Sequence, residues 1–171
     1  MPNWCSNVAE FSHDDPAMIA RLKKADEEGN IMKEFFPCPP ELYEGVEWYN
    51  WCIANWGTKW DFGHGGVITD EPTVLKLSFD TAWAPPTAAY EKLTEMGFQI
   101  YAKYYEPGVG FCGYWEDGDD EHYDIEEFTV DWIKANIPEG LDDQFGISEE
   151  AKFQEEDNAE DDSQDDYETD D

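Results

Sequence analysis

The chain has 171 residues, which predicts one domain with appendages, and its aromatic content of 16% is enough for a substantial core. The formal net charge of -32 disfavours binding to nucleic acid or to anionic membranes, because such a field repels both. The charge is uneven: residues 1–114 hold 17 acidic and 8 basic side chains, and residues 115–171 hold 25 and 2. A moderately acidic globular part therefore precedes a strongly acidic C-terminal third.

The first third of the chain predicts a strand followed by two helices. Apolar residues alternate over residues 4–11, which is typical of a strand. Asp14 or Asp15 then caps a helix that ends at Gly29-Asn30. After a proline-rich connector at residues 37–40, a second amphipathic helix begins near residue 41 and stops at Gly57.

The middle of the chain predicts further strands around a third helix. Residues 58–62 indicate a short strand and residues 67–69 resume pairing, whereas residues 74–83 alternate most clearly. Pro85-Pro86 opens a helix that stops at Gly97. Residues 98–105 predict the next strand, and residues 111–115 return as its hairpin partner.

The remaining chain predicts an acidic loop at residues 117–121, an amphipathic helix from about residue 125 to Pro138, and a tail. Beyond residue 148 the composition offers too little apolar surface to offset the cost of ordering, so we expect disorder. Without the additions, the order is βαββαβ, the ferredoxin-like α+β pattern. We therefore expect a ferredoxin-like domain at 1–117, a packed loop and helix at 118–147, and a tail at 148–171.

Cysteine usage and hydropathy bear on the compartment. The four cysteines show no C-x-x-C spacing, which favours buried free thiols over a metal site or a disulfide framework. The chain opens with no signal-peptide pattern, and no apolar run approaches the length of a membrane span. We expect a cytoplasmic protein that does not contact a membrane.

One aromatic stretch, residues 55–61, organises the prediction. Trp56 and Trp60 flank a Gly-Thr-Lys turn, and with Trp83 we expect them to be buried and packed together. Lys59 is the basic residue of this stretch, with Asp61, Asp80 and Glu106 as candidate partners. Lys59, Asp80 and Glu106 form either a polar site at the end of the sheet or a partly buried ion pair that joins the motif loops.

Other chemistry is weakly supported. The three histidines lie far apart beside turns or acidic runs, and the glycine-rich turns lack the spacing of phosphate-binding loops, so we expect no metal and no cofactor. Tyr101 and Tyr105 would be a platform for stacked bases, but the globular part lacks a basic groove, so we expect no direct binding to nucleic acid.

Four segments resemble the motifs of the YubB ferredoxin-like family: residues 1–7, 51–60, 79–86 and 105–111. The resemblance covers roughly residues 1–117, and the acidic extension after Glu116 lies outside its pattern. It implies a ferredoxin-like fold carried on phages, prophages and plasmids, and it transfers no catalytic residue. The motif residues that we take as site candidates are Asn55, Trp56, Gly57, Thr58, Lys59, Trp60, Asp80, Thr81, Trp83, Pro85, Tyr105, Glu106, Gly108 and Phe111.

The acidic third suggests a function through its carboxylates. Carboxylates spaced along a helix or tail imitate a phosphate array, so we expect a basic, nucleic-acid-binding host protein as partner, with a restriction enzyme or CRISPR effector as the target class. The alternatives are an enzyme using Lys59, Asp80 and Glu106, and an accessory protein with a merely solubilising tail. The residues expected to bind the partner are Asp117, Asp119, Asp120, Glu121, Asp124, Glu155, Glu156, Asp157, Asp161, Asp162, Asp165 and Asp166.

Overall fold

The computed structural model describes residues 2–43, 45–63 and 65–165, with side chains up to residue 159 in the last helix. The chain divides into two units, residues 1–122 and residues 123–171. The first unit is α+β and the second is helical. No helix within the described ranges combines the length and the apolar character needed to cross a membrane.

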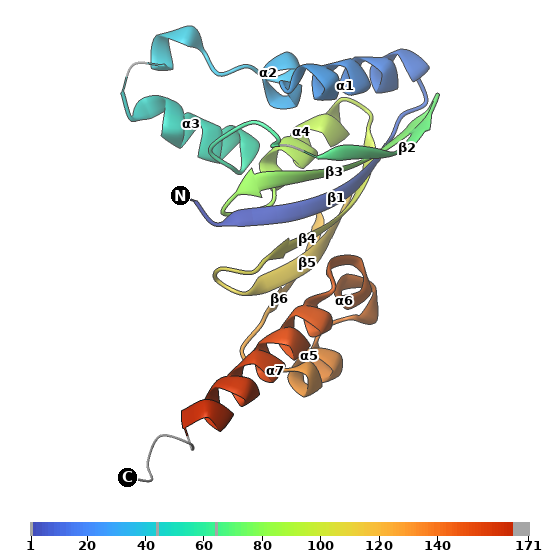
Figure 1. Ribbon diagram of the computed structural model, residues 1–171. Coiled ribbons are helices and arrows are strands. Elements are labelled where there is room, and N and C mark those ends of the chain that lie inside the picture. The colour runs from blue at the N-terminus through green and yellow to red at the C-terminus, as the bar shows by residue number, and fades with distance from the viewer. Residues whose placement is uncertain (1, 44, 64, 166–171) are drawn as a thin grey trace. The chain divides into compact units, whose positions relative to one another are not determined.

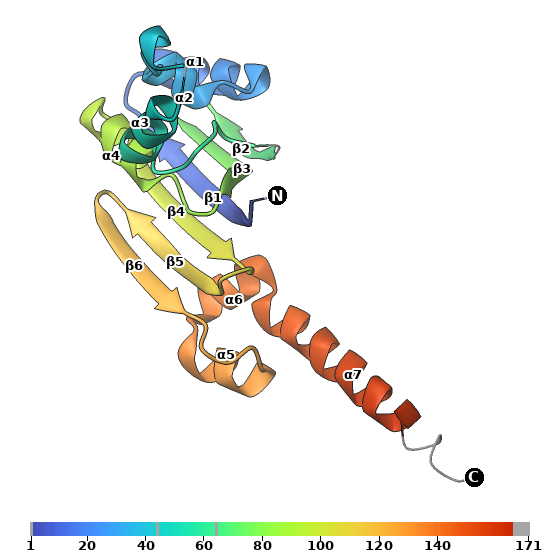
Figure 2. The same cartoon turned by 90° about the vertical axis from the view of Figure 1, so that its left-hand side faces the viewer.

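A six-stranded sheet forms the centre of the first unit (Figure 1). Its order is β2-β3-β1-β4-β5-β6, and the pairs β2–β3, β3–β1, β1–β4 and β4–β5 are antiparallel. The first four positions have the ferredoxin-like arrangement, so the predicted fold class is confirmed. Figure 2 shows β4, β5 and β6 side by side, with the last two extending the sheet beyond that core. The bounds are β1 Trp4–Ser12, β2 Gly66–Glu71, β3 Val74–Ala82, β4 Gln99–Glu106, β5 Phe111–Glu116 and β6 Asp119–Asp124.

The helices of the first unit cover one face of this sheet (Figure 1). Helix α1 begins after Asp15, whose side chain accepts a hydrogen bond from the N–H of Ala17, and it ends at Gly29 in the left-handed conformation. Alternate strand residues such as Phe11 and Leu77 are fully buried and meet the apolar stripes of the helices. The bounds are α1 Pro16–Glu28, α2 Ile31–Phe35, η1 Pro40–Leu42, α3 Glu47–Trp56 and α4 Thr87–Glu95.

Several segments of this unit differ from the sequence-based prediction. The helix predicted from near residue 41 begins at Glu47, and residues 31–35 form helix α2, which was not predicted. Residues 58–61 are bends and not a strand; the hydroxyl of Thr58 donates to the carbonyl oxygen of Ala82, and the carboxylate of Asp61 accepts the N–H of Met32. The predicted acidic loop at 117–121 is a hairpin leading into β6. Asp117 and Gly118 both have positive φ, at 45° and 106°, which suits a tight turn between twisted strands. Charged side chains are tolerated in β6 because it is an edge strand.

The second unit consists of α5 (Val130–Asn136), α6 (Glu139–Phe145) and α7 (Ile147–Asp165). Its small core includes Ile133, Leu141, Ile147 and Ala151, all fully buried. The predicted helix at 125–137 is therefore shorter and starts later, because Thr129 caps α5 by accepting a hydrogen bond from the N–H of Trp132.

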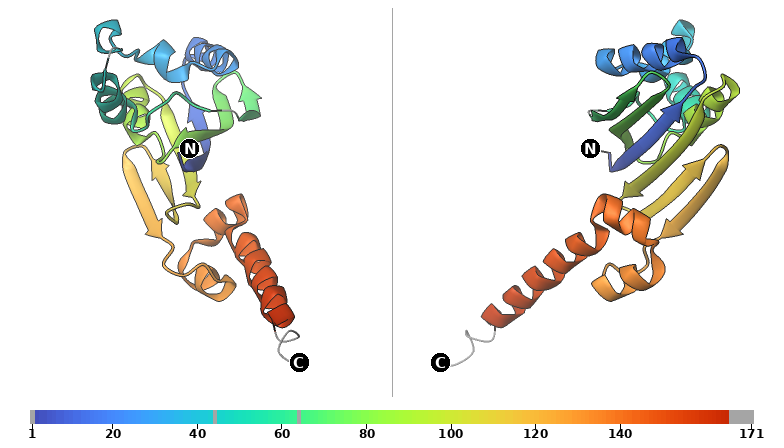
Figure 3. Two further views of the ribbon diagram at one scale, coloured as in Figure 1. Left: turned by 60° about the vertical axis from the view of Figure 1, so that its left-hand side comes forward. Right: turned by 90° about the vertical axis from the view of Figure 1, so that its right-hand side faces the viewer.

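The prediction of a disordered tail from residue 148 is wrong for residues 148–165, because these residues form most of helix α7 (Figure 3). Ile147 and Ala151 lie four residues apart and are buried, so one face of the first turns packs within the unit. Glu, Gln, Ala and Lys, which are strong helix formers, make up half of residues 152–165. Composition alone does not reveal this helix, because it counts acidic residues as disorder-promoting at every position in the chain. Residues 166–171 lie outside the described residues.

Candidate functional site

The motif segments meet at one end of the sheet, where β1 begins and where β3 and β4 finish. Ser6 of β1 pairs with Asp80 on one side and with Tyr105 on the other. The backbone N–H of Trp83 donates to the carbonyl oxygen of Asn3 at 2.8 Å. Segments separated by roughly eighty residues along the chain are thereby brought together.

The ammonium group of Lys59 lies among four aromatic rings. Its Nζ is 4.6 Å from the ring centroid of Trp60 and 5.6 Å from that of Trp83. Trp48 and Tyr49 of α3 each lie at 5.8 Å. Cation–π attraction at partly exposed sites contributes about 0.5–1 kcal/mol. The rings therefore account for the position of this cation.

The expected association of Lys59 with Asp80 and Glu106 is not formed among the described residues. Asp80 instead accepts a hydrogen bond from the hydroxyl of Ser6 at 3.0 Å. Glu106 is fully buried, and its carboxylate accepts the backbone N–H groups of Gly108 and Val109, both at 2.7 Å. Its charge therefore holds the turn that follows β4, so the arrangement contains neither the predicted polar site nor the predicted ion pair.

Asp61 also has a structural role. Its carboxylate accepts the backbone N–H groups of Met32 at 2.9 Å, Lys33 at 3.0 Å and Phe62 at 2.9 Å. These contacts tie the segment after α3 to the start of α2. Burial raises the pKa of Asp61 above its usual value, although the three N–H donors act in the opposite direction.

Several motif residues fasten α3 and its following turn to the core. The indole N–H of Trp56 donates to the carbonyl oxygen of Phe36 at 3.0 Å. The hydroxyl of Thr58 donates to the carbonyl oxygen of Ala82 at 2.9 Å. Asn55 accepts a hydrogen bond from Lys92 of α4 at 2.5 Å. These three motif residues therefore hold elements together.

The remaining motif residues shape the chain turns. Gly57 has φ of 81°, and a Cβ there would lie 3.1 Å from the backbone nitrogen of Thr87, so glycine is required twice over. A Cβ at Gly108 would lie 2.4 Å from the side chain of Asn3. Thr81 donates its hydroxyl to a carbonyl three residues on. Pro85 and Tyr105 are buried, and the ring of Phe111 packs on those of Tyr104 and His122.

The tryptophans of the motif divide into one buried and two exposed residues. Trp56 is 3% exposed, as predicted, but Trp60 and Trp83 are 38% and 40% exposed. Their rings stack with centroids 6.4 Å apart, so the expected packing of these two occurs at the surface. The difference arises because the chain leaves α3 at Gly57 as bends, whereas an alternating strand would have turned Trp60 inward.

The acidic residues proposed to bind a partner are partly engaged within the protein. Asp117 accepts the N–H of Ile100 at 2.9 Å, and Asp120 accepts the hydroxyl of Tyr104 at 2.7 Å. Glu155 accepts the N–H of Val130 at the start of α5. All members of the set whose side chains are described are exposed, including these three: Asp117, Asp119, Asp120, Glu121, Asp124, Glu155, Glu156 and Asp157. The side chains of Asp161, Asp162 and Asp165, and all of Asp166, lie outside the described part.

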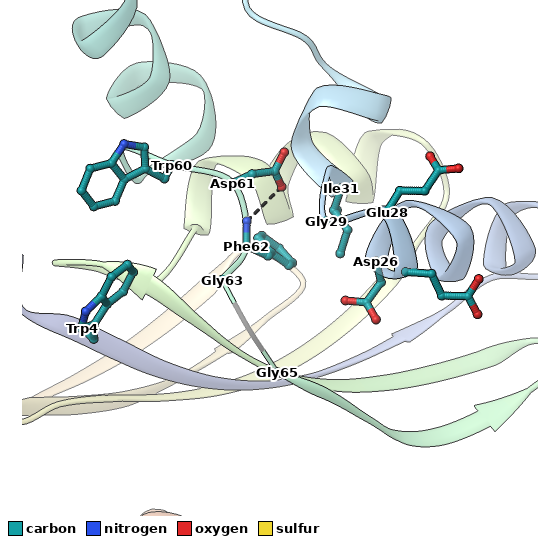
Figure 4. Close-up of a pocket in the computed structure, with 11 residues that line it drawn as sticks. Trp4, Asp26, Glu28, Gly29, Ile31, Trp60, Asp61, Phe62, Gly63 and Gly65 are labelled. Atoms are coloured by element: carbon teal, nitrogen blue, oxygen red, sulfur yellow. Dashed lines mark hydrogen bonds between the residues drawn. The ribbon is translucent and has the colours of Figure 1, made fainter.

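A groove of about 600 Å³ opens beside the aromatic rings. Trp4 and Trp60 stand at one side of it, and Asp26 and Glu28 of α1 stand at the other (Figure 4). Burial and the neighbouring charge of Glu27 raise the pKa of Asp26. The lining contains four acidic side chains and no basic one among the residues that the structure describes.

The groove involves residues that the sequence analysis did not select. Asp26, Glu27 and Glu28 end α1, where negative charge opposes the helix dipole. Such a local conflict between charge and position is a signal for function that the sequence does contain. Trp4 was assigned to a strand face, and its meeting with Trp60 depends on the path of residues 57–63.

Two buried cysteines of the first unit have raised thiol pKa values. Burial raises the pKa of the Cys5 thiol, and the carboxylates of Glu106 and Asp80 raise it further. Burial likewise raises the pKa of Cys52 to about 11. Thiols in this state are poor nucleophiles.

Within the described ranges, no group of three or more His, Cys, Asp or Glu side chains is arranged to hold a metal ion. Tyr105 is buried, which removes half of the proposed stacking platform.

The structure is similar to the crystal structure of the protein api92 from Yersinia pseudotuberculosis, with 19% sequence identity and a TM-score of 0.43. The similarity covers 58% of this chain and 42% of the Yersinia protein, so the chain spans less than half the length of that relative. The comparison with curated proteins gives no match.

A family model described as the ferredoxin-like domain in Api92-like protein matches residues 55–169. The matched region includes the acidic residues after Glu116, which the YubB resemblance had placed outside the shared pattern. It extends from the last residues of α3 over β2 to β6 and all of α7, and it leaves out β1. The chain belongs to the family of ferredoxin-like domains found in Api92-like proteins.

Proposed function

We propose that this protein is a non-enzymatic interaction protein whose helix α7 occupies a basic, nucleic-acid-binding surface of a partner protein. The single observation that carries the proposal is the charge of α7 (Ile147–Asp165), which has nine acidic residues and one lysine. At 1.5 Å per residue, its 19 residues span about 28 Å. That gives one net negative charge per roughly 3.5 Å, close to the 3.4 Å per charge of one strand of a DNA duplex.

The exposure of α7 supports the same proposal. All described side chains from Lys152 to Ala159 are exposed, and Phe153 is 67% exposed. An aromatic ring surrounded by carboxylates provides an anchor that excludes water at the centre of a contact. A solubilising helix would need neither the aromatic ring nor this charge density. The YubB resemblance suggests a phage or mobile element as the setting, with a restriction or CRISPR nucleoprotein as target.

The test uses two charge variants of equal net charge. The first replaces six carboxylates of α7 by their amides, and it leaves Glu155 in place because that residue contacts the start of α5. The second replaces six exposed carboxylates of the first unit. The α7 set is Glu156, Asp157, Glu160, Asp161, Asp162 and Asp165, and the control set is Glu10, Asp14, Glu41, Glu71, Glu91 and Glu95.

Each variant and the unaltered protein are used to capture partners from host lysate, and short duplex DNA is then added to the captured complexes. We expect DNA to displace the partner, and we expect the α7 variant alone to lose it, with a steep dependence on salt. Capture by both variants, or complexes that resist DNA, would refute the nucleic-acid mimic. Equal loss in both variants would show that general acidity, and not α7, attracts the partner.

A further inference from the structure

Four exposed aromatic rings form a continuous row on the first unit. The centroids of Trp4 and Trp60 are 6.0 Å apart, those of Trp60 and Trp83 6.4 Å, and those of Trp83 and Tyr49 6.3 Å. The four residues are between 36% and 45% exposed. Tryptophan and tyrosine in such a setting are the residue types that dominate binding energy at protein interfaces.

The backbone at Trp83 supports a functional reading of this row. Its φ is 67°, in the left-handed region that is disfavoured for a bulky residue. The hydrogen bond from its N–H to Asn3 helps to hold that conformation. The strain positions an indole that remains 40% exposed, so the protein gains little burial from it. Strain of this kind is concentrated at ligand-binding positions.

The charge beside the row identifies the kind of ligand. The groove of about 600 Å³ runs from Trp4 and Trp60 to Asp26 and Glu28 (Figure 4), and Glu27 also lines it. Its volume is within the range of about 300–1,000 Å³ typical of ligand sites. Burial and the charge of Glu27 raise the pKa of Asp26. A positively charged group entering the groove would relieve this repulsion.

The aromatic rings favour a planar cation. Among the described residues, Lys59 lies over the rings of Trp60, Trp83 and Tyr49 but not over that of Trp4, so Trp4 is the position in the row where a second cation meets least repulsion. Arginine stacks flat on an indole and still donates to carboxylates, whereas the ammonium of lysine is a compact, strongly hydrated charge. Arg21 already lies 4.3 Å above the ring of Phe35 in this chain.

We propose that this groove binds an arginine-containing segment of a protein partner, with one guanidinium stacked on Trp4 beside Trp60 and the next basic group paired with Asp26 and Glu27. The groove belongs wholly to residues 4–65, so the proposal does not depend on α7. Its acidic lining disfavours nucleic acid at the same place. The protein therefore has two separate surfaces for basic partners.

The probe is a five-residue peptide in which three arginines are separated by single glycines, and it is compared with the same peptide carrying lysines in place of the arginines. Binding is measured by calorimetric titration at about 0.15 M salt, because salt at this concentration screens long-range attraction between charges. We expect the arginine peptide to bind at least about fivefold tighter than the lysine peptide and to shift the indole N–H resonances of Trp4 and Trp60. Trp4→Ala and the double variant D26N/E27Q should each weaken binding about tenfold, whereas Trp4→Phe should keep most of it.

Three controls separate the groove from general acidity. E91Q/E95Q removes the same charge from α4, Phe153→Ala removes an exposed ring from the second unit, and the α7 charge variant removes the other proposed surface. Each should change the affinity less than twofold, and thermal melts verify that every variant folds. Equal affinity for the two peptides, or equal losses in D26N/E27Q and E91Q/E95Q, would refute the groove. Loss in the α7 variant alone would place the binding of basic segments on α7.

Discussion

Tyr90 and Tyr104 are buried tyrosines with opposite hydrogen-bonding states. The hydroxyl of Tyr90 has no partner among the described residues, whereas that of Tyr104 donates to Asp120 at 2.7 Å. An unsatisfied buried hydroxyl costs about 1–3 kcal/mol, so we expect Tyr90→Phe to raise the free energy of unfolding by about 1 kcal/mol. Tyr104→Phe should lower it by about 1–2 kcal/mol. Urea denaturation measures both, and a loss of stability in Tyr90→Phe would contradict the assignment.

We expect the substitution Asp26→Asn to stabilise the folded protein by an amount that depends on pH. The pKa of Asp26 is raised from 3.8 by burial and by Glu27, so the folded chain holds this proton more tightly than the unfolded chain. Ionisation therefore costs stability as the pH rises from 3.8 through the raised pKa, and the cost is complete above it. Asp26→Asn should be the more stable protein at pH 7, and the gain should fade towards pH 3.

Thermal melts across this range test the prediction for Asp26, with Glu91→Gln as an exposed control. A gain that persists undiminished at pH 3 would mean that the amide stabilises for a reason unrelated to ionisation. The same substitution is expected to weaken peptide binding in the groove, so its effects on folding and on binding have opposite signs.

At the residue scale, sequence located the motif but not the partners within it. Lys59 was recognised as a special cation, and its contacts proved to be aromatic rings. Glu106 was recognised as a candidate partner, but a buried carboxylate can also be satisfied by two amides of its own turn. Which donor a side chain meets depends on backbone paths such as that of residues 57–63, and periodicity carries no information on irregular segments.

We expect the two halves of helix α7 to differ in stability. Its first half contains the buried Ile147 and Ala151 and the contact of Glu155 with α5, whereas every described residue after Glu155 is exposed. Helical stability in water comes chiefly from packing of one face. We expect amide hydrogen exchange to be slow over residues 149–155 and near the intrinsic rate over residues 158–165. Uniform protection along α7 would contradict this division.

At the element scale, the same helix shows what composition misses. The acidic run was read as disordered, yet it continues a packed first turn in which Ser148 donates its N–H to Asp142. The hairpin into β6 was read as a loop although Asp117-Gly118 is a strong turn signal. In both places a high density of charge outweighed local signals that were present in the sequence.

At the scale of the whole molecule, the order of elements was predictable. Three helices with clear apolar stripes and strands with clear alternation lead to βαββαβ, and the structure has the corresponding strand order. The aromatic groove was not predictable in the same way. The groove is lined by residues 4, 60 and 26–28, which come from three separate segments. A pattern within one segment does not show which other segments lie beside it in the fold.

The net charge of -32 predicts how the whole protein responds to salt. Repulsion among like charges is stronger in the compact folded chain than in the expanded unfolded chain, so it lowers stability. The Debye screening length falls from about 30 Å at 0.01 M to about 8 Å at 0.15 M ionic strength. We expect the melting temperature to rise with sodium chloride over this range. The rise should be smaller in the α7 charge variant, because neutralising its six carboxylates removes much of the repulsion that salt would otherwise screen. A melting temperature that falls with salt would show that attractive ion pairs, such as Arg21 with Glu34, outweigh the repulsion.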